Sequence, residues 1–175
     1  MLEAEPQANV TMEPIDGDEE DLRQAIELLF FAYRDFTGEP DTVLSDFGFG
    51  RAHHRAIYFI GRNPDISVTD LLAILKITKQ SLSRVLSQLI DEGYVHQETD
   101  AVDRRRRLLR LSERGTALER QLTARQCRRI TRAYDAAGPA AVAGFRAILR
   151  QIIEPEDRER VGLRAAEDAV RRKSA

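Results

Sequence analysis

One stretch of the chain gathers hydrogen-bonding and basic side chains on a single predicted helix face. In TKQSLSRVLSQLIDEG, apolar residues recur at helical spacing through Leu82, Leu86 and Leu89. The opposite face carries hydroxyl, amide and basic groups and no carboxylate before Asp91; its members are Thr78, Lys79, Gln80, Ser81, Ser83, Arg84, Ser87 and Gln88. Arginine and glutamine can bind base edges with two hydrogen bonds, whereas lysine and serine more often bind phosphates. These side chains are therefore candidates for contact with double-stranded DNA, and Arg84 is the strongest candidate for reading a base.

A second basic cluster lies in the polar connection between two predicted strands. Residues 94–98 and 106–111 are the predicted strands, and residues 99–105 connect them. The cluster comprises Asp103, Arg104, Arg105, Arg106 and Arg107. Four consecutive arginines at a hairpin tip repel one another, and a polyanion would relieve that repulsion while releasing its own counterions. An arginine placed in a narrow minor groove would favour A·T-rich flanking DNA.

The predicted elements around these residues place the two basic surfaces in one lobe. Ser67 and Asp70 form a capping pattern at the start of a short helix, and Thr78 is a good N-cap for the next one. Gly93 is expected to end that second helix. The order helix, turn, helix, hairpin is that of a winged helix. In such a lobe the second helix enters the DNA major groove and the hairpin tip reaches an adjacent minor groove.

The remaining sequence predicts helices on both sides of this lobe. We expect helices over residues 19–37, 51–60 and 113–136, and a sixth one after Gly138-Pro139 that ends at Pro155. Gly38-Glu39-Pro40 and Gly61 are the predicted ends of the first two helices. The predicted fold is mainly α with a small β-hairpin (α+β). The predicted organisation is a flexible arm over 1–18, a single domain over 19–153, and a charged helix or tail over 154–175.

Within that single domain, two kinds of segment are expected. Residues 62–111 form the DNA-binding winged-helix lobe, whereas residues 19–61 and 112–153 serve mainly in dimerisation. The first, fifth and sixth helices carry more apolar surface than one small lobe can cover, and exposed apolar patches of that size usually mark an interface. The sequence therefore predicts a homodimer, whose two lobes would meet half-sites about 10–10.5 base pairs apart.

The charge of the chain is unevenly distributed along the sequence. The formal net charge is −2, yet residues 1–50 carry 2 basic and 13 acidic groups. Residues 51–114 carry 12 basic and 8 acidic groups, and residues 115–175 carry 13 and 8. Such asymmetry is a hint of polyanion binding, although a charged face is often only solvated.

Composition and motifs exclude several other classes of protein. Hydrophobic residues make up 42% of the chain and charged residues 32%, and no apolar run is long enough to span a bilayer. We therefore expect no membrane association and take the cytoplasm as the default compartment. A single cysteine excludes an intramolecular disulfide framework. There is no glycine-rich phosphate loop or HExxH pattern, so neither an enzyme nor a cofactor is expected.

Three residues that could bind a metal or an oxidant have simpler interpretations. The adjacent His53 and His54 point in different directions on a helix and cannot chelate one metal as an i,i+4 pair can, so no metal site is expected. Cys127, flanked by arginines that would lower its pKa if it were exposed, is a candidate redox sensor. The competing interpretation of Cys127 is a small packed residue at the dimer interface.

Three sequence segments together resemble the MarR family of winged-helix regulators. They are ITKQSLSRVLSQLIDEGYV, the Asp103-Arg104-Arg105 motif and LSERG at the start of the next helix. The resemblance covers residues 18–153. FFAYRDFTGEPD, GFGRAHHR and LKITKQSLSRVL further resemble the PetP-type subgroup of that family. In one departure, Lys76 stands where many relatives have glycine, which predicts a differently strained turn.

The resemblance implies a triangular homodimer that binds a pseudo-palindromic operator and regulates transcription. It implies that Asp103 braces the wing and Arg105 enters the minor groove, although the neighbouring arginines leave open which one does so. Many members of the family release DNA when a small phenolic or lipophilic effector, or an oxidant, acts on the dimer. By position, Tyr33, His53 and Arg55 are candidates for an effector pocket. The alternative function is a winged-helix protein-interaction module without specific DNA binding.

Overall fold

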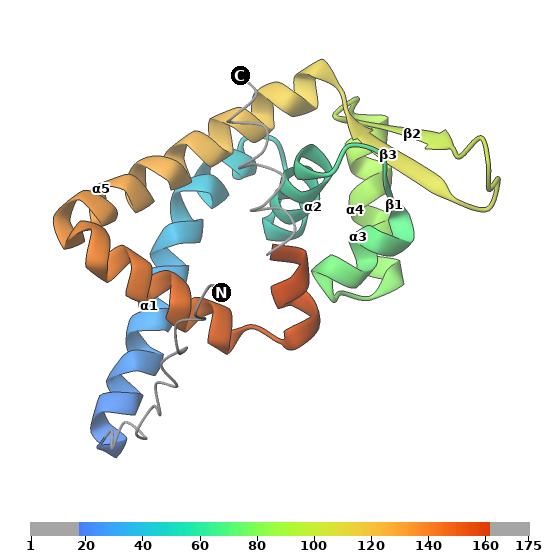
Figure 1. Ribbon diagram of the computed structural model, residues 1–175. Helices are drawn as coiled ribbons and strands as arrows, with labels where there is room; N and C mark the ends of the chain where they lie inside the picture. Colours follow the sequence, from blue (N-terminus) through green and yellow to red (C-terminus); the bar gives the residue numbers. More distant parts are fainter. Residues whose placement is uncertain (1–17, 162–175) are drawn as a thin grey trace, which may run out of the picture. The chain divides into compact units, whose positions relative to one another are not determined.

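The computed structural model describes residues 18–161. Residues 1–17, nearly all of the arm predicted over 1–18, and residues 162–175 lie outside this range. The described chain separates into two units, with the boundary between Asp35 and Phe36, and each unit is described by itself. In chain order the elements of Figure 1 are α1 (Glu19–Ser45), α2 (Arg51–Arg62), β1 (Ile66–Ser67), α3 (Val68–Leu75), α4 (Lys79–Asp91), β2 (Val95–Thr99), β3 (Arg107–Leu111) and α5 (Glu113–Ile152).

Helix α1 continues past its predicted end. The prediction that Gly38-Glu39-Pro40 ends the helix is wrong, because Pro40 lies inside α1. Proline in a helix interior removes one backbone hydrogen bond. However, Pro40, Val43 and Leu44 are all buried. Extending the helix places these three side chains in the apolar core, and that burial offsets the lost hydrogen bond.

Helix α2 also runs past its predicted end, because Gly61 lies inside it instead of terminating it. A Cβ atom at Gly61 would lie 2.9 Å from Leu111 Cδ1 and 3.3 Å from Glu119 Cγ. The glycine therefore allows the close approach of α2 to β3 and α5, and a larger residue there would require the Leu111 and Glu119 side chains to shift. Helix α2 buries Ala56, Ile57 and Ile60 and packs against α3, α4, α5 and β3.

The helix-turn-helix forms as predicted. The side chain of Ser67 accepts a hydrogen bond from Asp70 N (3.1 Å), and that of Thr78 accepts one from Ser81 N (3.1 Å), so both predicted N-caps are confirmed. Gly93 follows α4 with φ +75° in the left-handed region, as expected for a C-terminal stop. These local signals fix both ends of α4.

The sheet has three antiparallel strands in the order β1-β3-β2. The predicted hairpin is confirmed. Strand β2 begins and ends one residue later than predicted, and β3 begins one residue later. In the register of the hairpin, Gln97 pairs with Leu109. The two-residue strand β1, where Ile66 pairs with Leu109, was not predicted. The β2–β3 hairpin extends away from α3 and α4 (Figure 1). The predicted fold class, mainly α with a small antiparallel sheet, is confirmed.

Helix α5 contains the predicted break as a kink. Its N-cap Ser112 accepts a hydrogen bond from Gly115 N (3.0 Å), which confirms the predicted start. Gly138 has φ +80° and ψ 168° inside the element, so the chain turns there before Pro139 begins the second limb. Residues 155–161 form a further helical segment after the end of α5.

Apolar burial differs between segments. The core consists of buried side chains from residues 43 to 122, including Leu71, Leu89, Tyr94, Leu109 and Leu122. In the unit that ends at Asp35, by contrast, α1 exposes Leu22, Ile26, Leu28, Leu29, Phe30, Phe31 and Tyr33. The second limb of α5 exposes Phe145, Ile148 and Ile152. None of the helices within residues 18–161 combines the length and the apolar character that crossing a bilayer requires.

Candidate nucleic-acid interface

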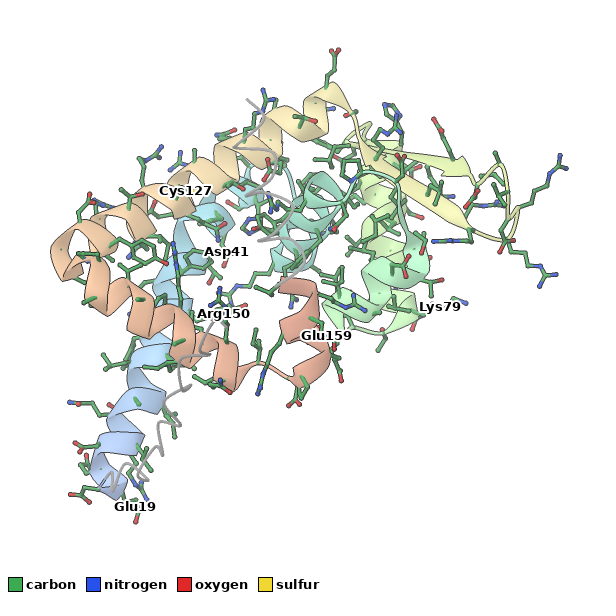
Figure 2. All side chains as sticks on the ribbon, viewed as in Figure 1. Glu19, Asp41, Lys79, Cys127, Arg150 and Glu159 are labelled. Atoms are coloured by element: carbon green, nitrogen blue, oxygen red, sulfur yellow. The ribbon has the colours of Figure 1, made fainter. Side chains whose placement is uncertain are left out.

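The outer face of α4 is solvent-exposed and largely unpaired. Its inner face buries Leu82, Val85, Leu86 and Leu89. On the outer face, five exposed side chains make no hydrogen bond or ion pair with any residue in the range 18–161. They are Lys79, Gln80, Ser83, Arg84 and Ser87. In Figure 2, Lys79 projects from the start of α4 into solvent. This face therefore offers free donors and acceptors to a partner.

Three of the predicted contact residues on α4 are engaged within the chain. Thr78 Oγ1 donates to Ser81 Oγ (2.8 Å) as well as accepting from Ser81 N, so both hydroxyls belong to the helix cap. Gln88 is half-buried: its Oε1 lies 3.0 Å from His53 Nε2, and its Nε2 donates to Glu92 Oε1 (2.9 Å). The structure thus separates the five free side chains of this face from three bonded ones, namely the cap residues Thr78 and Ser81 and the half-buried Gln88.

The wing is braced by Asp103 through its backbone neighbours. Arg105 N donates to Asp103 Oδ1 (3.0 Å), and Arg106 N donates to the Asp103 carbonyl (2.9 Å). Asp100 Oδ1 accepts a hydrogen bond from Val102 N (2.8 Å) earlier in the same loop. Short Asp side chains that bond to the backbone two residues on stabilise tight turns. The loop that carries the arginines is therefore ordered by its own carboxylates.

The four consecutive wing arginines fall into two pairs. Arg107 Nη1 donates to Thr99 Oγ1 (2.9 Å) and to the Arg104 carbonyl (3.1 Å). Arg106 Nη2 donates to Asp70 Oδ2 (3.3 Å) on α3. Within the described residues, the guanidinium groups of Arg104 and Arg105 are exposed and make no such contact. Two arginines thus hold the wing in place, and two remain available to a polyanion.

Two acidic residues in the lobe were not identified as functional from the sequence. Asp70 holds Arg106, and Asp65 accepts two hydrogen bonds from Arg110 Nη2 (2.7 and 2.8 Å) at the base of the wing. Asp65 has φ +66°, a conformation that Asp tolerates better than most residues. The partners in the Asp70–Arg106 pair are 36 residues apart in sequence, and those in the Asp65–Arg110 pair are 45 residues apart. Only the antiparallel pairing of β1 with β3 brings the partners together.

The turn before α4 is strained and held by a distant segment. Lys76 has φ +49°, in the left-handed region that a non-glycine residue adopts at a cost of about 1 kcal/mol. Its Nζ donates to Glu156 Oε1 and Asp157 Oδ2, each at 3.0 Å. These hydrogen bonds, first that of Asp157 and then that of Glu156, raise the pKa of Lys76. Lys76 is therefore strained at this turn, and its contact with residues 156–157 was not predicted from the sequence.

The candidate effector residues lie in different surroundings. Tyr33 is an exposed residue of α1 in the first unit, and Arg55 is an exposed residue of α2. His53 and His54, in α2, are half-buried and buried respectively, and burial lowers the pKa of each. Both histidines are therefore neutral at pH 7.

Cys127 lies on α5 with its thiol exposed (Figure 2). Within residues 18–161, no three His, Cys, Asp or Glu side chains are grouped so as to hold a metal ion.

Comparison with known proteins gives consistent results. The model of the MarR family matches residues 47–106. The HTH-type transcriptional regulator PetP of Rhodobacter capsulatus is 52% identical over 137 residues, which cover 78% of this chain and 82% of that protein. The fold is similar to that of Streptococcus pneumoniae FabT in complex with DNA, with TM-score 0.68 and 18% identity over 75% of this chain and 94% of that chain. A mutant MarR from E. coli complexed with operator DNA gives TM-score 0.60 and 18% identity over 79% and 100% of the two chains.

Proposed function

Because this chain belongs to the MarR family of transcriptional regulators, we propose that it binds a specific double-stranded DNA operator as a homodimer. Helix α4 enters the major groove, and the wing enters the adjacent minor groove. Residues 62–111 form the DNA-binding lobe, and the exposed apolar parts of residues 19–61 and 112–153 form the dimer interface. The relatives FabT and MarR, whose structures contain DNA, support double-stranded DNA as the partner.

The observation that carries this proposal is the set of side chains left free by the fold. On α4, Lys79, Gln80 and Arg84 are exposed and unpaired, whereas the caps and Gln88 are bonded within the chain. In the wing, Arg104 and Arg105 are the free pair. Free guanidinium groups on a braced loop match the requirement of a narrow minor groove, whose negative potential attracts arginine. Arg105, whose backbone is held by Asp103, is assigned to that groove.

Homodimerisation is supported by the exposed apolar side chains of two segments. Ile26 is 69% exposed and Leu29 47% exposed on α1, and Ile148 is 61% exposed on α5. Each of these two helices would leave an apolar face in water, which a monomeric protein rarely does. A second copy of this chain would cover these faces and place two copies of α4 on one side of a duplex. Half-sites would then be spaced by about one helical turn, ~10–10.5 base pairs.

Selection of bound sequences from random duplexes tests the proposal directly. We expect an enriched pseudo-palindrome with two half-sites. Substitution Arg84→Ala should weaken binding by about 1–3 kcal/mol, concentrated at one base pair of each half-site. Substitution Arg105→Ala should weaken binding and reduce the preference for A·T pairs in the flanks. A uniform loss over all operator variants for Arg84→Ala would instead identify a phosphate contact.

Salt dependence separates DNA binding from a protein-interaction role of the same lobe. Each phosphate contact contributes a slope of about −0.9 to the plot of log affinity against log salt concentration. Arg105→Gln should make this slope less steep, whereas Arg132→Gln, which removes the same charge from an exposed site far along α5, should not. A slope near zero for the wild-type protein would remove the DNA-binding proposal in favour of a protein-interaction module.

A further inference from the structure

A chain of hydrogen bonds joins the start of α2 to the last turn and C-cap of α4. Gly50 N donates to His53 Nδ1 (3.1 Å), His53 Nε2 lies 3.0 Å from Gln88 Oε1, and Gln88 Nε2 donates to Glu92 Oε1 (2.9 Å). The His53 ring is stacked on Phe49, with ring centroids 4.9 Å apart and an interplanar angle of 13°. We name the hydrogen-bonded set Gly50, His53, Gln88 and Glu92 the α2–α4 relay.

The donor and acceptor of each hydrogen bond in the α2–α4 relay follow from the Gly50 amide at one end of the relay. The Gly50 amide can only donate, so Nδ1 of His53 must present a lone pair and Nε2 must carry the proton. Nε2 therefore donates to Gln88 Oε1, which leaves the Gln88 amide nitrogen facing the Glu92 carboxylate. All four groups have compatible roles only when His53 is neutral.

We propose that His53 is a positioning residue for DNA recognition, which sets the rotation of α4 by holding Gln88. This inference rests on the proposed DNA-binding function. Gln88 lies one helical turn beyond Arg84, and residues four apart are neighbours on a helix surface. The hydrogen bond from His53 to Gln88 therefore holds α4 in one rotation about its axis, and this rotation fixes the direction in which the Arg84 side chain projects. The sequence predicted that Gln88 contacts DNA, whereas this proposal gives Gln88 the role of orienting Arg84.

Protonation of His53 would break the α2–α4 relay at a defined point. An imidazolium ion carries a proton on Nδ1, which would face the Gly50 N–H, so one of the two donors would lose its acceptor. Burial lowers the pKa of His53, and the hydrogen bond to Gln88 and the charge of Glu92 oppose this only in part. Phe49 adds no charge, and Glu92 is the charged group that acts on His53 from α4. The relay is therefore intact at neutral pH and is lost as the pH falls.

The predicted effect of pH on DNA binding has an unusual sign. Protonation of histidines normally adds positive charge and strengthens binding to a polyanion. Here, specific affinity for the selected operator should hold at neutral pH and fall as the pH is lowered below the ordinary histidine pKa of 6.5, because burial lowers the pKa of His53. Affinity for a random duplex of the same length should not fall, because it depends on charge more than on the direction of Arg84.

The experiment compares the purified full chain with His53→Phe, Gln88→Met and the double variant, using the selected operator and a random duplex. The lost hydrogen bonds should reduce operator affinity at about pH 7.5 by about tenfold and leave random-duplex affinity unchanged. Both single variants should abolish the fall in affinity at acid pH, and the double variant should lose no more than either single variant. His96→Gln, which alters an exposed histidine on β2, is the matched control and should retain the wild-type pH profile.

The possible outcomes separate the two proposals. If the wild-type protein binds no duplex specifically, the proposed function fails and the positioning role falls with it. If the wild-type protein binds its operator but His53→Phe keeps the wild-type affinity and pH profile, only the positioning role is overturned. If Gln88→Met changes the preference at one base pair while His53→Phe does not, Gln88 reads a base and the inference is overturned.

Discussion

The winged-helix lobe and the outer helical segments use similar apolar residues in opposite ways. We compare the lobe and helix α2, which packs against it, with the outer segments, residues 19–35 of α1 and 139–152 of α5. Leu71, Leu89 and Leu109 of the lobe are 0% exposed. Leu28 of α1 is 64% exposed and Ile152 of α5 is 59% exposed. The lobe buries these apolar side chains through contacts within one chain, whereas the outer segments leave theirs exposed.

This difference indicates two sources of stability in one polypeptide. The lobe has paired strands, capped helices and a shared core, so its free energy of unfolding depends on intrachain contacts. The outer segments gain little from burial within the chain, and their apolar faces would be covered in the proposed homodimer. The position of the lobes on DNA would then depend on protein concentration as well as on sequence. The following predictions compare the two regions.

The largest expected effect is on the lobe core. Leu89→Ala removes a fully buried side chain from the inner face of α4 and should lower the free energy of unfolding by about 2–5 kcal/mol. The same change at exposed Leu28 should alter the stability of the dissociated chain by less than about 0.5 kcal/mol. Urea unfolding of both variants at several protein concentrations measures the contrast. Equal losses at low concentration would contradict the division into two regions.

The next effect concerns association of the outer segments. Leu29→Glu places a carboxylate in the exposed apolar face of α1, once per subunit. The dissociation constant of the dimer should rise by about 100-fold or more, because an interface core does not tolerate an unpaired charge. Analytical ultracentrifugation measures the dissociation constant. Gln97→Glu adds the same charge to the exposed face of β2 and serves as the control; if it dissociates the dimer equally, the assignment of the interface is wrong.

A smaller effect distinguishes the buried histidine of the lobe from an exposed one. Burial is the main cause of the lowered pKa of His54, opposed by Asp41 and Glu119. The unfolded chain therefore takes up a proton more readily than the folded chain. The free energy of unfolding should be constant above the unfolded pKa of 6.5 and should fall as the pH is lowered through and below it.

Urea unfolding across that pH range, for the wild type and for His54→Asn, measures this contribution. The variant should show a smaller loss of stability at acid pH than the wild type. His96→Asn, on exposed β2, should leave the slope unchanged. Identical pH profiles for the wild type and His54→Asn would contradict the role of burial.

The smallest effect is expected at the turn that joins α3 to α4. Lys76→Gly removes the left-handed strain, a gain of about 1 kcal/mol, and loses two exposed ion pairs, which solvent largely screens. The free energy of unfolding should therefore change by less than about 1 kcal/mol. Glu156→Gln combined with Asp157→Asn isolates the ion pairs, and the difference between the two experiments gives the strain.

The sequence alone determined the features that depend on local chemistry. Ser67, Thr78 and Ser112 cap helices because a side-chain oxygen can reach a backbone amide three residues on, whatever the rest of the fold does. The kink at Gly138 and the β2–β3 hairpin follow from similarly short-range preferences. The basic face of α4 and the wing cluster could therefore be predicted, together with the winged-helix fold.

Only the tertiary structure decided the features that depend on distant residues. Pro40 and Gly61 read locally as helix ends, yet both lie inside helices because burial and close packing outweigh the local preference. Four adjacent arginines are equivalent in the sequence, and only the positions of Asp70 and Thr99 divide them into braces and free groups. Likewise, Gln88 resembles its neighbours on α4 until α2 places His53 beside it. A side chain's availability is a property of what lies around it in space, and spacing along the chain does not contain that information.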